Sequence, residues 1–288
     1  MKFPAFAYTA PATIDEACEL LHETGVESRL LAGGQSLLPM MAFRLATPER
    51  LVDIGQLPGL DRIEIRNDHL VIGARVTHAQ AMSSATVRAG NSLVAQALPK
   101  IGHAAIRTAG TVVGSLAHAD PAAELPAVAI ATDAFVVAVS VRGRRTISAT
   151  ALYSGYLETT LERDEIIVEV HFPTLDTAIA TAGIDEVSRR HGDYAIVGLA
   201  HVLEMPEQIV SSARFVFFGI GATPLRAINC EQRLVGKKLD VDLIHQATTA
   251  VMEELETKDD LHGSSSYRRH LVGLLASRAM KNHLNRTV

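Results

Sequence analysis

The sequence predicts an α+β fold in which a short α/β unit opens the chain and antiparallel strands dominate the middle. Three observations carry this prediction. At the N-terminus an amphipathic helix precedes two apolar strand-like segments, a pattern typical of a small parallel unit. Asn67-Asp68 and Arg142-Gly143 each separate two strand-like segments, as the turns of antiparallel hairpins do. Two amphipathic helices then close the chain.

The first unit is predicted from its helix signals. Thr13 and Glu16 have the spacing of a capping box, so a helix should begin between them. The apolar segments 29–32 and 51–54 are predicted as the strands that follow. We therefore expect an N-terminal α/β unit over residues 1–57, ended by the Pro-Gly pair that comes next.

The rest of the chain divides into two further units. We expect a second, α+β unit over residues 58–177 and a C-terminal unit of sheet and helices over residues 178–288. The strands predicted in these units span 63–65, 70–73, 135–139, 144–147, 166–172, 195–203 and 213–218. The closing helices are predicted over 241–255 and 266–282.

Composition and charge exclude several classes of protein. The chain has 288 residues, a net charge of -5 and a pI near 6.2, so nucleic-acid binding and membrane-surface binding are not expected. No stretch approaches the roughly 20 apolar residues of a membrane span, and the N-terminus lacks a signal-peptide pattern, so a cytoplasmic protein is expected. The two cysteines, Cys18 and Cys230, are too far apart for a Cys-x-x-Cys site, and the twelve histidines show no metal spacing.

Two glycine-bearing segments could bind a diphosphate. The first runs from a strand through Gly33, Gly34 and Ser36 into a helical turn. Glycine leaves neighbouring N–H groups uncovered and lets an anion approach, and the serine adds a hydroxyl donor. The pattern is neither G-x-G-x-x-G nor a P-loop, so by itself it is equally typical of a tight strand-to-helix turn.

The second segment, residues 110–121, is expected to be a loop and again offers backbone donors and small hydroxyl groups. Thr111 and Ser115 suit a ribityl chain or a phosphate, and Glu124, just beyond, could accept hydrogen bonds from ligand hydroxyls. Taken alone, Glu124 is better explained as an acid that stabilises the first turn of a helix.

Taken together, the two segments are far more specific. In order and separation they resemble the FAD-binding medium subunit of molybdenum hydroxylases, as found in carbon monoxide dehydrogenase, quinoline 2-oxidoreductase and nicotine dehydrogenase. The flavin domain of xanthine dehydrogenase is a more distant relative. The resemblance covers nearly the whole chain, and the N-terminal Lys2-Phe3-Pro4-Ala5-Phe6 and Gln35 look closest to the quinoline-oxidising branch. The matching stretches are residues 32–39, 106–107, 110–121, 190–195 and 267–279.

The resemblance implies a fold and a set of cofactor contacts. The fold would be a two-subdomain FAD-binding fold of the vanillyl-alcohol-oxidase/PCMH type, followed by a C-terminal domain of antiparallel sheet and helices. The residues implied to contact FAD are Leu30, Ala32, Gly33, Gly34, Gln35, Ser36, Leu37, Thr111, Val112, Gly114, Ser115, Ala119, Glu124, Ile167 and Tyr194.

The roles implied for these residues differ along the cofactor. Residues 32–36 would wrap the pyrophosphate, with Leu30 and Leu37 beside the adenine. The second group would line the ribityl chain and flavin: Thr111, Gly114, Ser115 and Glu124. Ile167 would pack or hydrogen-bond through its backbone near the ring, and Tyr194 would lie close to the isoalloxazine.

Two departures from the family pattern stand out. The family commonly has two glycines where this chain has Val113-Gly114, and valine does not readily adopt positive φ. Either the backbone at Val113 is ordinary here, or the segment shifts and its flavin contacts differ. Some relatives also have a lysine-rich stretch where this chain has Arg189 and Arg190, and arginine is not a neutral replacement for lysine.

The implied function is electron relay. No hydrolytic motif is present, so the difficult chemistry should come from a cofactor. Electrons released at a molybdenum centre would pass through [2Fe-2S] clusters of a partner to the FAD of this chain and then to an external acceptor. A small [2Fe-2S] subunit and a large molybdopterin subunit are the implied partners, in a dimer of heterotrimers. The substrate expected is an N-heteroaromatic such as quinoline, and no side chain of this chain is expected to act as a catalytic acid or base.

Two other functions remain open from the residues. One is a self-contained flavin oxidoreductase, which would need its own substrate pocket and shows no covalent-flavin signal here. The other is a non-redox nucleotide-binding module. A yellow complex with iron–sulfur absorption would favour the relay, whereas a colourless monomer would favour the module.

Overall fold

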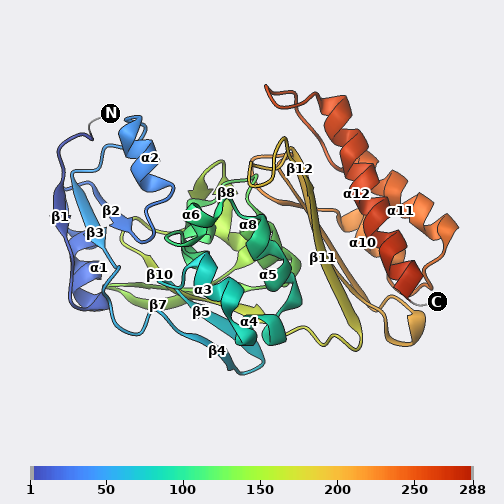
Figure 1. Ribbon diagram of the computed structural model, residues 1–288, viewed down its shortest axis with the longest axis horizontal. Coiled ribbons are helices and arrows are strands. Elements are labelled where there is room, and N and C mark those ends of the chain that lie inside the picture. The colour runs from blue at the N-terminus through green and yellow to red at the C-terminus, as the bar shows by residue number, and fades with distance from the viewer. Residues whose placement is uncertain (1–2, 287–288) are drawn as a thin grey trace.

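The computed structural model describes residues 3–286, so Lys2 of the N-terminal motif lies outside the described residues. Three main sheets follow one another along the long axis of the molecule, in the order of the chain (Figure 1). This mixed architecture confirms the predicted fold class. No helix in the described part of the chain combines the length and apolarity that crossing a bilayer requires.

The first sheet is parallel, with strand order β1-β3-β2. Its helix begins as predicted, because the Thr13 side chain accepts a hydrogen bond from the Glu16 amide at 3.1 Å. The short strand β1 was not predicted, since three residues give no usable periodicity. The elements are β1 (Ala7–Thr9), α1 (Ile14–His22), β2 (Ser28–Leu31), α2 (Leu37–Ala42) and β3 (Arg50–Asp53).

The second sheet is antiparallel, with strand order β4-β5-β10-β6-β7. The hairpin turn at Asn67 and Asp68 has φ of 50° and 57°, which is the left-handed geometry that Asn-Asp signalled. The strands are β4 (Ile63–Arg66), β5 (His69–Gly73), β6 (Phe135–Ser140), β7 (Gly143–Ser148) and β10 (Ile166–Pro173), with a separate ribbon of β8 (Tyr153–Gly155) and β9 (Glu158–Thr159).

Short helices cover one face of this second sheet (Figure 1). They are α3 (His78–Ser83), α4 (Ala85–Gly90), α5 (Ser92–Ala97), η1 (Leu98–Lys100), α6 (Ala104–Arg107), α7 (Val112–His118), α8 (Glu124–Ala131) and α9 (Ala149–Leu152). Helix α7 is a correction, because we expected residues 110–121 to be a loop. Val112, Val113 and Leu116 are buried on one side of this helix, and Val113 therefore has an ordinary helical backbone.

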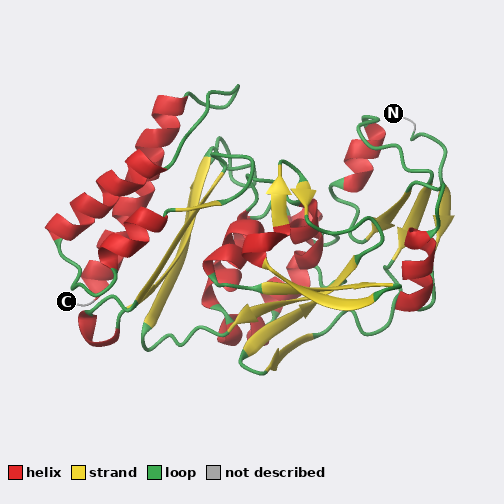
Figure 2. Ribbon diagram, turned by 180° about the vertical axis from the view of Figure 1, so that it is seen from behind, coloured by secondary structure: helices red, strands yellow, loops and turns green. Residues whose placement is uncertain are grey.

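The third sheet is antiparallel and packs on both faces (Figure 2). Ala200, Val202 and Val216 belong to the core shared with the second unit, whereas Leu199 and Phe217 pack against the C-terminal helices. Burial on both faces explains why β12 is apolar except at His201 and at its last residue, Glu204. The elements are β11 (Ala180–Val187), β12 (Val197–Glu204), η2 (Pro206–Gln208), β13 (Ser212–Phe218), β14 (Leu225–Arg226), α10 (Ile228–Leu234), α11 (Val241–Glu254) and α12 (Ser265–Arg286); β11 was not predicted.

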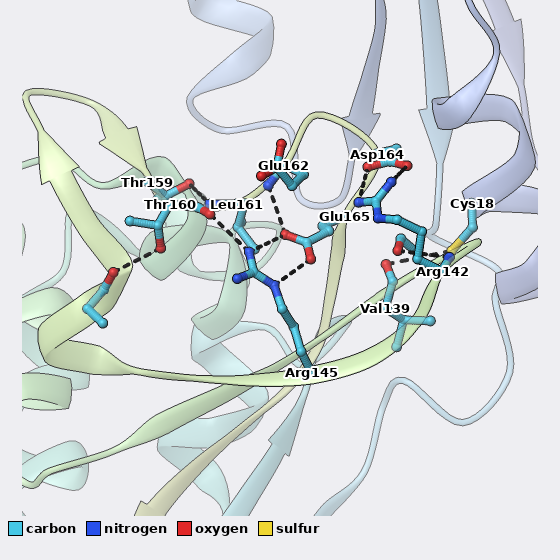
Figure 3. Close-up of polar contacts among 12 residues, drawn as sticks. Cys18, Val139, Arg142, Arg145, Thr159, Thr160, Leu161, Glu162, Asp164 and Glu165 are labelled. Carbon is cyan, nitrogen blue, oxygen red and sulfur yellow. Dashed lines mark hydrogen bonds and ion pairs between the residues drawn. The ribbon is translucent and has the colours of Figure 1, made fainter.

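Polar contacts join the first unit, which contains α1, to the second sheet (Figure 3). Arg142, on the β6–β7 turn, forms two hydrogen bonds of 2.6 and 2.8 Å with Asp164, and His22 of α1 lies 2.8 Å from the same carboxylate. The Arg142 guanidinium lowers the pKa of Asp164 to about 2. The Cys18 thiol contacts the Val139 carbonyl oxygen at 3.7 Å. These contacts fix the orientation of the first glycine segment relative to the second sheet.

Candidate functional site

The two glycine segments lie against each other. A Cβ atom placed on Gly33 would fall 2.2 Å from the Ala109 carbonyl oxygen and 2.8 Å from the Cα of Gly110. Real Cβ atoms do not approach other atoms so closely, so only glycine fits at this position. The β2–α2 connection and the α6–α7 connection, far apart in the sequence, therefore form one surface.

The first segment presents free backbone donors. Gly34 has φ of +69°, which turns the chain sharply between β2 and α2. The hydrogen bonds found among residues 3–286 include none donated by the amides of residues 33–36. Ser36 stands at the N-cap of α2 but makes no capping bond with its side chain. Several amides and one hydroxyl are thus available to a ligand here.

More backbone amides of the second segment are hydrogen-bonded within the protein than we expected. The Gly114 amide donates to Thr111 Oγ1 at 3.0 Å, and the Ser115 amide donates to the Thr111 carbonyl at 3.1 Å. The Val112 amide donates to the Val76 carbonyl at 3.0 Å. The expectation of uncovered amides is therefore corrected at these three positions, because α7 and its cap use them. The groups this segment has left to offer include the hydroxyls of Thr111 and Ser115.

His78 anchors the second segment and was missed from the sequence. Its amide donates to the Gly110 carbonyl at 2.9 Å, and its ring Nε2 lies 2.9 Å from Ser115 Oγ. The side chain is 3% exposed. Burial, and then the Arg107 guanidinium, lower the pKa of His78 to about 4, so the ring is neutral at pH 7. Only its place directly after Thr77, which caps α3, could have drawn attention to it.

Glu124 is buried at the first turn of α8. Burial is the main cause that raises its pKa to about 7, and the carboxylates of Glu186 and Asp120 add to the effect while Lys100 opposes it. At pH 7 this carboxyl is therefore close to half protonated. It can then donate a hydrogen bond as well as accept one, unlike an ordinary exposed glutamate.

Tyr194 lies on the connection between β11 and β12, near the end of the second segment. Partial desolvation, and then the neighbouring Asp120 carboxylate, raise the pKa of Tyr194 to about 12, although the residue is 65% exposed. Arg268 of α12 donates to the carbonyls of Ile196 and Gly219, and the Gly219 amide donates to the Pro121 carbonyl at 2.8 Å. The C-terminal unit thus holds the tyrosine beside the second segment.

Several predicted contact residues are core residues. Val112 and Ile167 are 0% and 3% exposed, and Leu30 packs partly buried against the same core. Ile167 flanks a bulge in β10, where the pairing with β6 shifts register. Such residues could touch a ligand only through the backbone or a small exposed edge. Ala119 ends α7 with φ of 54°, a left-handed C-cap.

Cavities of about 430 and 280 Å³ occur elsewhere, one lined by α10 and α11 residues and one between α1 and the second sheet. Neither includes the glycine segments. Within residues 3–286 no cluster of histidine, cysteine, aspartate and glutamate side chains is suited to a metal ion.

Two family models together match nearly the whole chain. Residues 4–175 match the FAD binding domain in molybdopterin dehydrogenase, and residues 183–283 match the CO dehydrogenase flavoprotein C-terminal domain. The chain belongs to the FAD-binding medium subunits of molybdenum hydroxylases. Its relatives are oxidoreductase subunits, so this chain is an oxidoreductase subunit as well. FAD is its cofactor, as the first family model states.

Sequence relatives support the assignment over the full length. The chain is 40% identical to the nicotine 6-hydroxylase medium subunit of Paenarthrobacter nicotinovorans, over 97% of this chain and 98% of the relative. It is 38% identical to the 6-hydroxypseudooxynicotine dehydrogenase complex subunit alpha of the same organism, over 99% and 97%. The xanthine dehydrogenase FAD-binding subunit of Escherichia coli O157:H7, at 24% identity, is more distant.

Solved structures agree with the fold. Carbon monoxide dehydrogenase from Hydrogenophaga pseudoflava superposes with a TM-score of 0.93 at 35% identity, covering 96% of both chains. Quinoline 2-oxidoreductase from Pseudomonas putida 86 superposes with a TM-score of 0.92 at 36% identity, covering 98% of both.

The residues at the site fit a dinucleotide. The uncommitted amides of residues 33–36 suit a diphosphate, whose oxygens only accept hydrogen bonds at neutral pH. No carboxylate lies within the first segment to repel it. The Glu124 carboxylate contributes to the raised pKa of Tyr194, so the two side chains lie near each other. Glu124 suits the hydroxyls of a bound dinucleotide, and Tyr194 suits its ring.

Proposed function

We propose that this medium subunit binds FAD between residues 32–36 and residues 111–115 and relays electrons. They would come from [2Fe-2S] clusters of a small partner subunit and leave to an external acceptor. The observation that carries the proposal is the contact of Gly33 with Ala109 and Gly110, which joins both glycine segments into one surface. The three units expected from the sequence, 1–57, 58–177 and 178–288, would be the first FAD subdomain, the second, and the domain that carries Tyr194.

The chain's own residues would bind and orient rather than react. The amides of residues 33–36 donate to the pyrophosphate, with Ala32 and Gln35 in the same turn and Leu30 and Leu37 beside the adenine. Thr111, Ser115 and Glu124 serve the ribityl region, and Tyr194 lies beside the ring. FAD, when bound, supplies both one-electron and two-electron chemistry. No acid or base of this chain is required on the hydroxylated substrate.

The partners proposed are those of the family: a small [2Fe-2S] subunit and a large molybdopterin subunit, in a dimer of heterotrimers in the cytoplasm. The relatives named for nicotine, caffeine and quinoline favour an N-heteroaromatic substrate. Quinoline is our specific candidate, on the basis of the N-terminal motif and Gln35.

Anaerobic reduction of the co-purified complex tests the relay. Quinoline, nicotine and caffeine are added in turn, and flavin bleaching at about 450 nm is followed beside the iron–sulfur absorption. We expect one N-heteroaromatic to bleach both chromophores in the intact complex and none to bleach the isolated flavoprotein. Bleaching of the isolated flavoprotein by the same compound would support a self-contained oxidoreductase instead. A complex without flavin would refute the assignment.

A further inference from the structure

A buried histidine lies directly behind the second half of the proposed FAD site. His78 is 3% exposed, and its Nε2 lies 2.9 Å from Ser115 Oγ. Ser115 itself is only partly buried, so the pair extends from the core toward the surface of α7. Among the residues that the structure describes, no group hydrogen-bonds to the other ring nitrogen, Nδ1.

The neutral ring carries one proton, and its position decides what Ser115 can do. With the proton on Nδ1, a buried N–H would face no acceptor, and Ser115 would have to donate its hydroxyl proton to Nε2. With the proton on Nε2, the ring donates to Ser115 Oγ, and the Ser115 hydroxyl proton is free to point elsewhere. Nδ1 lacks a partner in both arrangements, and only the second leaves the Ser115 hydroxyl proton available to a ligand.

A phosphate or ribityl acceptor needs the second arrangement. The oxygens of a diphosphate accept hydrogen bonds, so a serine that binds them must donate. The Ser115 and Gly114 amides are already bonded to Thr111, so the Ser115 hydroxyl is one of the donors that this segment can still offer. The charge of Arg107, whose Nη1 donates to the carbonyls of Ile101 and Gly102 at 2.9 and 2.8 Å, disfavours a second ring proton.

We propose that His78 is a positioning residue for FAD: its Nε2–H donates to Ser115 Oγ and thereby directs the Ser115 hydroxyl proton to a cofactor oxygen. The inference rests on the proposed FAD site. His78 itself does not touch the cofactor and acts only through Ser115. It also holds the segment in place through its backbone bond to Gly110.

A double-mutant cycle tests this role on the intact complex. FAD affinity is measured by flavin-fluorescence titration after cofactor removal, for wild type, His78→Leu, Ser115→Ala and the double variant. We expect each single change to weaken binding about tenfold, and the double variant to be about tenfold weaker too, because both changes remove one donor. His78→Gln, whose side-chain amide can donate from a similar place, should restore most of the affinity.

The matched control is His171→Leu. His171 is also largely buried in the second unit, and its Nε2 lies 2.9 Å from Glu169, away from the glycine segments. This control should leave FAD affinity unchanged. If the losses of FAD affinity from His78→Leu and Ser115→Ala multiply to about a hundredfold in the double variant, His78 does not act through Ser115. The same conclusion follows if His78→Leu has no effect while Ser115→Ala does. In both cases the FAD site itself still stands. If neither these changes nor Gly33→Val alter FAD binding, the proposed site itself is wrong.

A measurement on the unmutated protein is independent of folding defects. The ¹⁵N chemical shifts of the His78 ring in the FAD-loaded protein report which nitrogen carries the proton. We expect protonation at Nε2 only. Protonation at Nδ1 would overturn the proposal, because Ser115 would then be the donor to the ring.

Discussion

The two glycine segments look alike in the sequence but differ in which of their groups are free to bind a ligand. In the first, Gly33 and Gly34 shape a turn whose amides stay uncommitted. In the second, Thr111 caps α7, and the amides of Gly114 and Ser115 are bonded within the segment. The first segment is therefore suited to bind through the backbone, whereas the second offers the hydroxyls of Thr111 and Ser115 beside fewer free amides. A shared composition does not imply a shared mode of binding.

The largest effect should follow a change at the contact between the segments. In Gly33→Val the added atoms would collide with the Ala109 backbone, which cannot rotate away as a side chain could. We expect FAD retention to fall at least ~100-fold and the free energy of unfolding to drop by about 1–3 kcal/mol. Flavin content and thermal unfolding measure the two effects.

Gly25→Asn is the control for this change. Its position, outside both glycine segments, has φ of +85°, which asparagine tolerates, and a Cβ there would meet no atom within 4 Å. We expect this variant to keep its fold and most of its flavin. Wild-type flavin and stability in Gly33→Val would contradict the close approach of the two segments.

The next effect concerns pH. The pKa of Glu124 is raised to about 7 in the folded protein against 4.5 for an unperturbed glutamate. Between these two values the unfolded chain loses the proton while the folded chain keeps it, so the contribution of Glu124 to stability should fall as pH rises and level off above pH 7. The lowered pKa of His78 acts in the opposite direction, so the Glu124 effect is measured as the difference from a variant that lacks this carboxyl. The full cost is about 3 kcal/mol.

Glu124→Gln should remove this loss. We expect the FAD-free variant to be more stable than wild type at pH 8 and similar to it at pH 4, as measured by urea unfolding. Asp164→Asn is the opposite case, because the pKa of Asp164 is lowered to about 2, and this variant should lose stability at pH 7. A wild-type stability that does not fall relative to that of Glu124→Gln between pH 4.5 and pH 7 would contradict the burial of a protonated Glu124.

The smallest effect distinguishes the loss of a helix cap from the loss of a cofactor contact. Thr111→Val removes the cap of α7 and should cost about 1 kcal/mol, together with a severalfold loss of FAD affinity; Thr111→Ser should keep both. Thr13→Val removes the equivalent cap of α1, far from the site, and should lower the melting temperature alone. If Thr13→Val weakened FAD binding equally, the loss at Thr111 would reflect general stability.

The sequence predicted the long, periodic elements and the strong caps well. The Thr13 cap, the Asn67-Asp68 hairpin and the closing helices are local signals, and the structure contains all of them. The sequence did not predict α7, because Gly114 suggested a loop. In the structure the burial of Val112 and Leu116 stabilises a helix there. His78 could not be recognised either, since its role depends on a contact with Ser115 across 37 positions in the chain.

The most direct test is hydrogen exchange of FAD-free and FAD-loaded protein at single-residue resolution. We predict that FAD slows exchange strongly at the amides of residues 33–36, which donate no hydrogen bond without it. The amides of Gly114 and Ser115 should already exchange slowly and change little. Unchanged exchange at residues 33–36, with new protection elsewhere in the chain, would contradict a cofactor held by the first glycine segment.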